Sequence, residues 1–476
     1  MMAVSLLLLL PLSAGYAMVR WACPLPPTPW RILFRASLAT ALAIGLSSIT
    51  YFLWCVWVGP RQPGLFATES LVFGGLAIAF WRAGDVSPLL RSNSGLTPPA
   101  RQRLAFFFVI LCAVVISGWY LWHSPHGSWD AWAIWNLRAR FLYRGEEAWT
   151  VGFSPLIPWS HPDYPLLVPG AVARGWTIVG RETPLVPQGI ACLFGAATVG
   201  VLMAVLALLR GSSQGYLGGL VLLSTPYFLD LMTAQYADVP LGFFFLASAA
   251  LFEIHDREET GSHRLPFLAG VLTGLAAWTK NEGSLFLVAT VVVRLRGFAT
   301  RPQRAVLREL IAFALGWLPI GLVLIFFKLR YAPANDLVAG QDWQATRERV
   351  LDLSRYLLIA EYFLFAVVRI GPGAVVVLIA YRALLGGPAQ RRVRQLWSHA
   401  VAVLVLMLAG YAFVYLTTPN NLAWHLHDSI DRLFMQLWPT ALLAFFLTTA
   451  SWEEVPEPQD KPADLSTARE TLRYNE

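Results

Sequence analysis

Apolar segments of membrane-spanning length recur along the whole chain and constrain its fold more than any other feature. Segments such as 104–122, 184–209 and 433–450 stay apolar over about 20 residues, the length that an α-helix needs to cross a bilayer core. Hydrophobic residues make up 56% of the 476 residues and charged residues only 14%. The sequence therefore predicts an all-α polytopic membrane protein with about 13 transmembrane helices. The expected spans are 2–19, 36–58, 65–81, 104–122, 184–209, 215–233, 239–254, 265–280, 283–295, 309–328, 356–381, 397–417 and 433–450.

The arginines are concentrated in alternate loops, which predicts the orientation of the chain. Loops rich in Lys and Arg stay on the cytoplasmic side, whereas the loops 59–64 and 234–238 carry almost no basic residue. The net charge of +7 is thus explained by topology, and no nucleic-acid partner is expected. We expect a multi-pass protein of the plasma (inner) membrane. The arginines assigned to the cytoplasmic side are Arg20, Arg31, Arg35, Arg82, Arg91, Arg101, Arg103, Arg210, Arg257, Arg264, Arg294, Arg296, Arg301, Arg304, Arg308, Arg382, Arg391, Arg392 and Arg394.

Three regions are expected along the chain. Residues 1–103 hold the first spans, whose role the sequence does not indicate, and residues 104–450 hold the remaining spans with the candidate site. Residues 451–476 are acidic and rich in proline, so we expect a disordered cytoplasmic tail. The four cysteines show neither the spacing of a metal knuckle nor that of a disulfide framework.

The first long outward segment, 123–183, carries a single carboxylate among tryptophans. Asp130 follows the span 104–122 closely and stands between Trp129 and Trp132, residues typical of a lipid–water interface. The residues that follow suit amphipathic helices lying in that interface. The alternative is that Asp130 only caps a helix, because aspartate is favoured at the N-cap.

Further polar groups recur at the outward ends of the expected spans, where a catalytic cavity would open. Ionisable groups at membrane depth are costly and normally line a cavity or pair with one another. The candidates besides Asp130 are His161, Asp163, Tyr164, Asp238, Lys280, Glu282, His425 and Arg432.

Each candidate also has a structural interpretation. Asp163 and Asp238 could cap helices, Lys280 and Glu282 could form a structural ion pair, and His425 could be a surface residue. A divalent metal is compatible with the histidines and aspartates, but no ligand spacing assigns one, so no metal site or certain cofactor is predicted.

Together these motifs resemble the GT-C superfamily of integral-membrane glycosyltransferases, and most closely its protein mannosyltransferases and lipid A aminoarabinose transferases. The resemblance covers about Leu104 to Pro439 and departs from the family in one respect, since Ala131 follows Asp130 where the family often has a second acid. The motifs that carry it are Trp129 with Asp130, His161 with Pro162, the run from Tyr236 to Pro240, and the run from Thr279 to Gly283.

The resemblance implies a hexosyl- or pentosyl-transferase that takes its sugar from a polyprenyl-phosphate donor. A lipid, glycan or protein hydroxyl would be the acceptor, on the non-cytoplasmic face, with membrane lipids around the donor. Asp130 would be the general base, and the reaction would invert the anomeric carbon. Cations such as Lys280, Arg432 or His161 would stabilise the leaving phosphate. The remaining site residues would bind the donor's sugar or phosphate.

A polytopic transporter or flippase of a lipid-linked or small solute is the alternative. Glu361 and Arg369 inside the expected span 356–381 favour it, because transporters carry charges within their spans. Against it stand the lack of an obvious internal repeat and the large outward loop.

Overall fold

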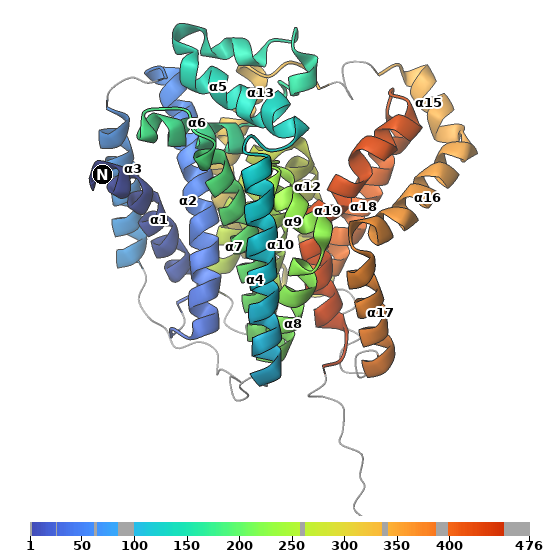
Figure 1. The fold of residues 1–476 in the computed structure, drawn as a ribbon. Helices are drawn as coiled ribbons and strands as arrows, with labels where there is room; N and C mark the ends of the chain where they lie inside the picture. Colours follow the sequence, from blue (N-terminus) through green and yellow to red (C-terminus); the bar gives the residue numbers. More distant parts are fainter. Residues whose placement is uncertain are drawn as a thin grey trace, which may run out of the picture.

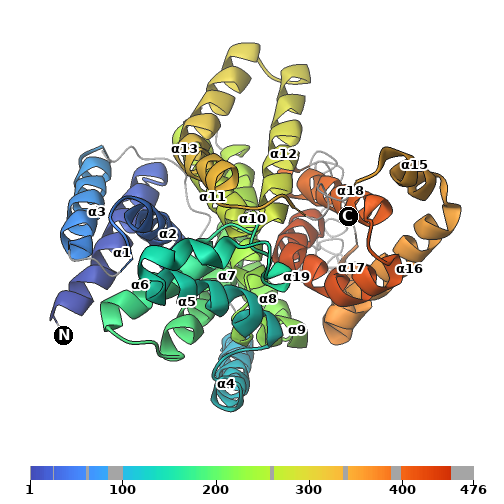
Figure 2. The same ribbon diagram turned by 90° about the horizontal axis from the view of Figure 1, so that it is seen from above.

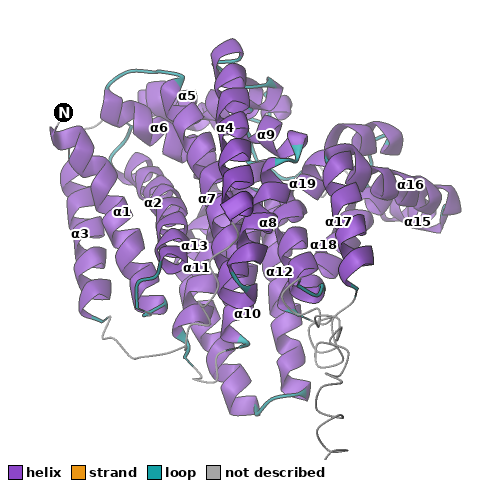
Figure 3. Ribbon diagram, turned by 60° about the horizontal axis from the view of Figure 1, so that its bottom comes forward, coloured by secondary structure: helices purple, strands orange, loops and turns teal. Residues whose placement is uncertain are grey.

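A computed structural model of the chain describes residues 2–24, 26–60, 64–83, 100–257, 262–335, 341–386 and 398–451. Within these ranges the chain forms helices joined by loops and no strand, which confirms the predicted all-α class (Figure 3). Residues 452–476 of the predicted tail lie outside the described ranges. The longer helices are α1 (Met2–Ala22), α2 (Pro29–Trp57), α3 (Leu65–Arg82), α4 (Ala100–His123), α7 (Leu185–Arg210), α10 (Asp238–His255), α13 (Gln303–Arg330), α16 (Leu353–Ile370), α18 (His399–Thr417) and α19 (Leu422–Thr448). The shorter helices are η1 (Ala131–Trp135), α5 (Asn136–Arg144), η2 (Glu146–Phe153), η3 (Pro158–Ser160), α6 (Leu167–Val179), α8 (Ser212–Leu223), α9 (Pro226–Thr233), α11 (Arg264–Thr279), α12 (Asn281–Leu295), η4 (Arg296–Ala299), α15 (Trp343–Leu351) and α17 (Pro372–Leu385).

Eight helices in the described part of the chain are long and apolar enough to cross a membrane. Several of them leave apolar side chains uncovered by protein: on α4, Leu104, Phe107 and Val115 are all more than half exposed. Exposed apolar surface of this extent is unfavourable in water and is normal against lipid. The fold is therefore consistent with a multi-pass membrane protein.

The predicted count of about 13 spans is not confirmed, because several expected spans are broken or short. The expected span 215–233 divides into α8 and α9 just before Pro226, and proline disfavours helical backbone in the residue that precedes it. The expected span 356–381 divides at Gly371 into α16 and α17, which meet at 93°. The helices α11 and α12 have only 16 and 15 residues. Counting the bent pair as one span gives nine candidates among the described residues.

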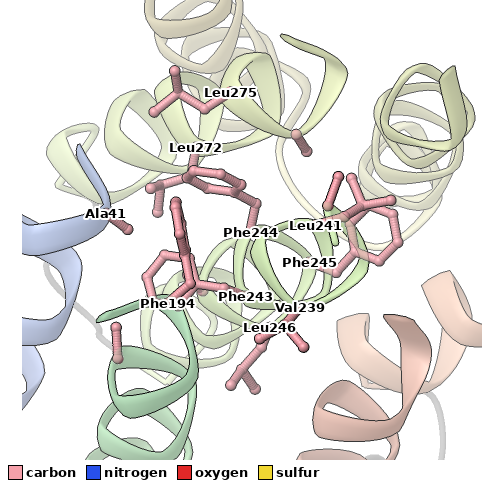
Figure 4. Packing of buried hydrophobic residues seen from close by; sticks show 14 of the residues in the cluster. Ala41, Phe194, Val239, Leu241, Phe243, Phe244, Phe245, Leu246, Leu272 and Leu275 are labelled. Carbon is pink, nitrogen blue, oxygen red and sulfur yellow. The ribbon is translucent and has the colours of Figure 1, made fainter. Parts of the chain in front are cut away.

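Helix α10 forms the centre of the bundle. All its residues from Asp238 to Ile254 are buried, as expected of a helix that is apolar on every face. Figure 4 shows its phenylalanines packed between neighbouring helices. The Phe245 ring stacks on Phe286 of α12 with centroids 4.3 Å apart, and Phe244 meets Phe194 of α7 at 5.7 Å. A rigid core thus fixes the position of Asp238 at one end of α10.

The first three helices lie along one side of the bundle (Figure 1) and join it through buried polar contacts. On α2, the Ser48 hydroxyl donates to the carbonyl oxygen of Leu166 at 2.9 Å and accepts from the Trp278 indole at 3.3 Å. Between α3 and α6, both carboxylate oxygens of Glu69 accept from the Arg174 guanidinium, at 2.6 and 2.8 Å. Such contacts hold α2 and α3 against the rest of the protein. The boundary between the predicted regions 1–103 and 104–450 stays a prediction.

The segment between α4 and α7 folds into short helices at one end of the bundle. Figure 1 shows α5 lying across the ends of the long helices, and Figure 2 shows α5 and α6 over the bundle from above. These are the helices that the sequence predicts in the first outward loop, and their placement in a membrane interface stays a prediction. The candidate site lies where this segment meets α10, α12 and α19.

Candidate functional site

A tight turn brings Asp130 to the end of the bundle. Gly127 has φ +74°, and the Ser128 amide donates to the carbonyl oxygen of Ala234 at 3.2 Å, between α9 and α10. A Cβ atom on Gly127 would lie 2.4 Å from the same oxygen and 2.7 Å from the Cβ of Ala131. Only glycine fits this close approach and this left-handed backbone without strain.

We expect Gly127→Ala to lower both activity and stability. The substitution adds a Cβ against backbone and forces a non-glycine residue into a left-handed conformation, at a cost of about 1–3 kcal/mol. The turn would shift, and Asp130 three residues later would shift with it. Thermal unfolding and turnover would be measured beside Gly118→Ala, which adds its methyl group to open space on α4. If Gly127→Ala and Gly118→Ala had the same unfolding temperature and the same turnover, the turn at Gly127 would not be needed to position Asp130.

The Asp130 carboxylate forms an ion pair with Arg432 of α19. Asp130 precedes a π-helical turn, η1, a geometry common at functional sites, and its side chain makes no capping hydrogen bond within the described residues. The structure therefore does not use Asp130 as a helix cap. Its backbone amide donates to the Tyr236 hydroxyl at 3.2 Å, and the Tyr236 ring centroid lies 5.9 Å from the Arg432 guanidinium carbon. Burial raises the pKa of Tyr236, which keeps this hydroxyl protonated.

A second buried ion-pair cluster lies beside the first. The Lys280 ammonium lies 3.1 Å from Asp238 Oδ1 and 2.9 Å from Glu282 Oε1. Gln436, one helical turn beyond Arg432 on α19, donates to Asp238 Oδ1 at 2.6 Å. Helix α19 thus presents Arg432 to Asp130 and Gln436 to Asp238 from a single face. The Lys280–Glu282 ion pair, which the sequence offered as the structural alternative, is present, whereas the Asp238 side chain makes no capping hydrogen bond among the described residues.

Lys280 reaches this cluster because α11 and α12 are separate helices. Its backbone is extended, with φ −151° and ψ 164°, so one residue breaks the helical path between Thr279 and Asn281. A Cβ atom on Gly283 would lie only 2.0 Å from the carbonyl oxygen of Ala276. The break is therefore tightly packed, and it directs the lysine into the protein.

Asp163 anchors a third group of polar side chains. Its Oδ2 atom accepts from the amides of Asn281 at 2.7 Å and Asn335 at 2.8 Å. Lys328 of α13 donates to the Asp163 carbonyl oxygen at 2.5 Å and to Asn281 Oδ1 at 2.8 Å. Helix α6 begins at Leu167 with Leu166 as its N-cap, so the alternative in which Asp163 caps a helix is not the structure observed.

Aromatic rings connect these groups. The Tyr164 ring stacks with the His161 imidazole, with centroids 4.7 Å apart, and with the Trp135 ring, with centroids 5.8 Å apart. The Lys280 ammonium lies 5.8 Å from the centroid of Tyr164, a cation–π geometry. His161 has φ +46°, and such strain in a residue other than glycine is common at functional sites.

Solvent access differs within the site. The side chains of Asp130 and Arg432 are 16% and 20% exposed, whereas that of Asp238 is 1% exposed. The Asp130 carboxylate is therefore accessible to a bound molecule, whereas the Asp238 carboxylate contacts Lys280 and Gln436 inside the protein. Cations and carboxylates alternate across the site, so each charge has an opposite neighbour.

One predicted site residue stands apart. His425 pairs with the Thr418 hydroxyl at 3.1 Å and packs edge-on against Tyr415, and no hydrogen bond joins it to the other candidates in the described ranges. Over the same ranges, no three His, Cys, Asp or Glu side chains are grouped so as to hold a metal ion.

The predicted candidates did not include five of the polar residues of the site, namely Tyr236, Asn281, Lys328, Asn335 and Gln436. Lys328 had a signal in the sequence, because the chain contains only Lys280, Lys328 and Lys461, and two of these three lie in the site. Asn281 lies in a motif next to Lys280. Gln436 and Asn335 had no such signal.

Comparisons with known families, curated proteins and solved structures found no match for this chain. The functional argument therefore rests on the chemistry of the site.

Proposed function

We propose that this protein is a membrane glycosyltransferase that transfers a sugar from a polyprenyl-phosphate donor to an acceptor hydroxyl, with inversion, on the non-cytoplasmic side. The observation that carries the proposal is the Asp130–Arg432 pair. A partly exposed carboxylate stands beside a guanidinium at one end of an apolar bundle, with the Lys280 cluster behind them. This combination supplies a proton acceptor and phosphate-binding cations in one place.

The pair suits a phosphate leaving group. Arginine binds phosphate as well as carboxylate through its planar fork, so a donor phosphate would compete with Asp130 for Arg432. Binding the donor would thereby free the Asp130 carboxylate to accept a proton. Base activation would then depend on an occupied donor site, which limits unproductive chemistry on the acceptor.

The reaction is a single displacement at the anomeric carbon. Asp130 takes the proton of the acceptor hydroxyl as its oxygen forms the new bond to that carbon. The bond between the carbon and the phosphate oxygen breaks, and its electron pair leaves with the lipid phosphate. Arg432 would stabilise the developing charge. Asp238 and Gln436 would hold Lys280 and α19 in position, and Asp163 would hold Asn281 and Lys328.

The direct test uses purified protein in detergent with a panel of polyprenyl-phosphate sugars and hydroxyl acceptors. Acceptor-dependent release of polyprenyl phosphate, with the sugar inverted in the product, is expected with one member of the panel. Release that does not need the acceptor, or a product with retained configuration, would contradict the mechanism.

Orientation is tested separately by cysteine labelling. Ser128 and Arg304 are both exposed, and the arginine pattern predicts that they lie on opposite sides of the membrane. In a variant without the native cysteines, a cysteine at Ser128 should react with an impermeant maleimide in intact cells. A cysteine at Arg304 should react only after permeabilisation. The reverse pattern would move the candidate site to the cytoplasmic face.

The alternative, a transporter or flippase, is favoured by the 93° bend between α16 and α17, since transporters use broken helices. Arg369, which led to this alternative in the sequence, pairs with Asp431 of α19 at 2.8 Å at a partly exposed position. Lipid-linked sugar crossing proteoliposome membranes without any glycosyl transfer would favour the transporter.

A further inference from the structure

A charged cavity of about 420 Å³ opens at the end of the bundle remote from the candidate site. It lies where α10 and α12 end and α13 and α18 begin, and Arg294, Arg301, Glu309 and His399 are among its lining residues. Helix α10 runs from Asp238 at the candidate site to His255 at this cavity. Its 18 residues span roughly 27 Å at ~1.5 Å per residue, so the two sites are distinct.

The carboxylates of the cavity are already neutralised. Arg294 donates to both oxygens of Asp256, at 2.7 and 2.8 Å, and to Glu309 at 2.5 Å. Arg301 donates to the other Glu309 oxygen at 2.8 Å. With Arg296 also in the lining, three guanidinium groups face two carboxylates among the described lining residues. Guanidinium groups therefore outnumber carboxylates among the described lining residues, and both of these carboxylates already have arginine partners.

His399 supplies a second, independent observation. Its side chain is 2% exposed and lines the cavity, yet neither ring nitrogen has a hydrogen-bond partner in the described part of the chain. Its ring packs on Phe252 with centroids 4.5 Å apart, which fixes the imidazole at the cavity wall. Buried polar atoms without a partner are uncommon in folded proteins and indicate a missing ligand or water.

We propose that this cavity is a binding site for a phosphate or phosphate-monoester anion. Arginine forks and imidazole nitrogens are the donors that recognise such groups, and the cavity volume exceeds that of a phosphate by enough to admit an esterified one. The arginine pattern predicts that this end lies on the cytoplasmic side. The anion is then either a soluble cytoplasmic phosphate or the headgroup of an inner-leaflet phosphomonoester lipid.

The test titrates inorganic phosphate into full-length protein in a lipid-free maltoside detergent and measures binding by calorimetry. Saturable binding is expected in the parent protein, with an affinity at least about tenfold weaker in Arg301→Gln and in His399→Phe. In Arg301→Gln, Glu309 still has its ion pair with Arg294, and in His399→Phe an aromatic ring still packs against Phe252. The matched control is Arg304→Gln, which removes the same charge from an exposed position outside the lining. A second control, Arg432→Gln, removes a phosphate-binding cation from the candidate site.

A parallel measurement separates the two sources of the anion. The same proteins are reconstituted in nanodiscs of phosphatidylcholine with a minor fraction of phosphatidic acid, and the lipid retained on purification is quantified by mass spectrometry. Retention of phosphatidic acid that is lost in both cavity variants identifies a lipid headgroup as ligand. Saturable binding of inorganic phosphate without such retention identifies a soluble one. The proposal is overturned if neither probe binds, if Arg304→Gln weakens binding as much as the cavity variants, or if only Arg432→Gln abolishes it.

Discussion

We expect Asp130→Asn to lower turnover by about 10²–10⁴-fold, the range typical for loss of a general base. Asparagine keeps the size of the side chain and an oxygen that Arg432 can still contact, but it cannot take the acceptor proton. The loss should appear in turnover, with little change in the amount of donor bound. Steady-state kinetics and donor binding on the purified variant measure both quantities.

Thermal unfolding makes this prediction specific. If Asp130 only stabilised the fold, its replacement would act on the midpoint of unfolding, whereas a base affects the rate. The matched control is Asp428→Asn, which removes a carboxylate that lies 3.6 Å from Arg432 but is 59% exposed. An exposed pair of this kind contributes little, so turnover should stay close to that of the parent protein. Equal turnover of the Asp130 and Asp428 variants would remove Asp130 from the catalytic role.

The elements of the site that follow from local sequence were predictable. Asp130, Asp238 and Lys280 each stand at a point where an apolar run ends, and a charge there must pair or line a cavity. The structure brings all three to one end of the bundle, in contact with Arg432 or with one another. The all-helical class followed in the same way from the length and apolarity of the runs.

The contacts between distant segments were not predictable. Arg432 and Asp130 are 302 residues apart, and the sequence around either residue does not indicate that they form an ion pair. It follows from the packing of α19 against α10, which a single sequence does not reveal. The span count is not confirmed for a related reason, because hydropathy averaged over about 20 residues does not register a break at one proline or one extended residue. Pro226, Pro372 and Lys280 are such breaks.

The interpretation of Asp163 and Asp238 as helix caps was wrong, because side chains on other helices compete with the backbone amides for the same carboxylates. Asp163 and Asp238 each stand near the start of a helix, where a capping bond is worth about 1 kcal/mol. In the folded protein each carboxylate instead accepts from side chains on other helices, Asn281 and Asn335 for the first and Lys280 and Gln436 for the second. Buried charge-assisted contacts are stronger than a cap, and tertiary packing decides which of the two forms.

Lys280→Met should destabilise the protein by about 3–5 kcal/mol, because it leaves a buried carboxylate without its partner. The side chains of Asp238 and Lys280 are 1% and 7% exposed, so water cannot replace the lost ammonium. Glu282, which pairs with the same lysine, adds like-charge repulsion once the ammonium is gone. Reversible unfolding in mixed micelles measures the free energy.

A double-mutant cycle identifies the cause. Asp238→Asn keeps an oxygen for Gln436 and removes the charge, so Lys280→Met combined with Asp238→Asn should recover much of the loss. Arg369→Met is the matched control, since it breaks the pair with Asp431, in which the two side chains are 41% and 32% exposed. We expect that variant to lose no more than about 1 kcal/mol. If Lys280→Met and Arg369→Met cost the same, or if Asp238→Asn restores nothing, the unpaired buried carboxylate is not the source of the instability, and the cluster behind Asp130 is not held by this pair.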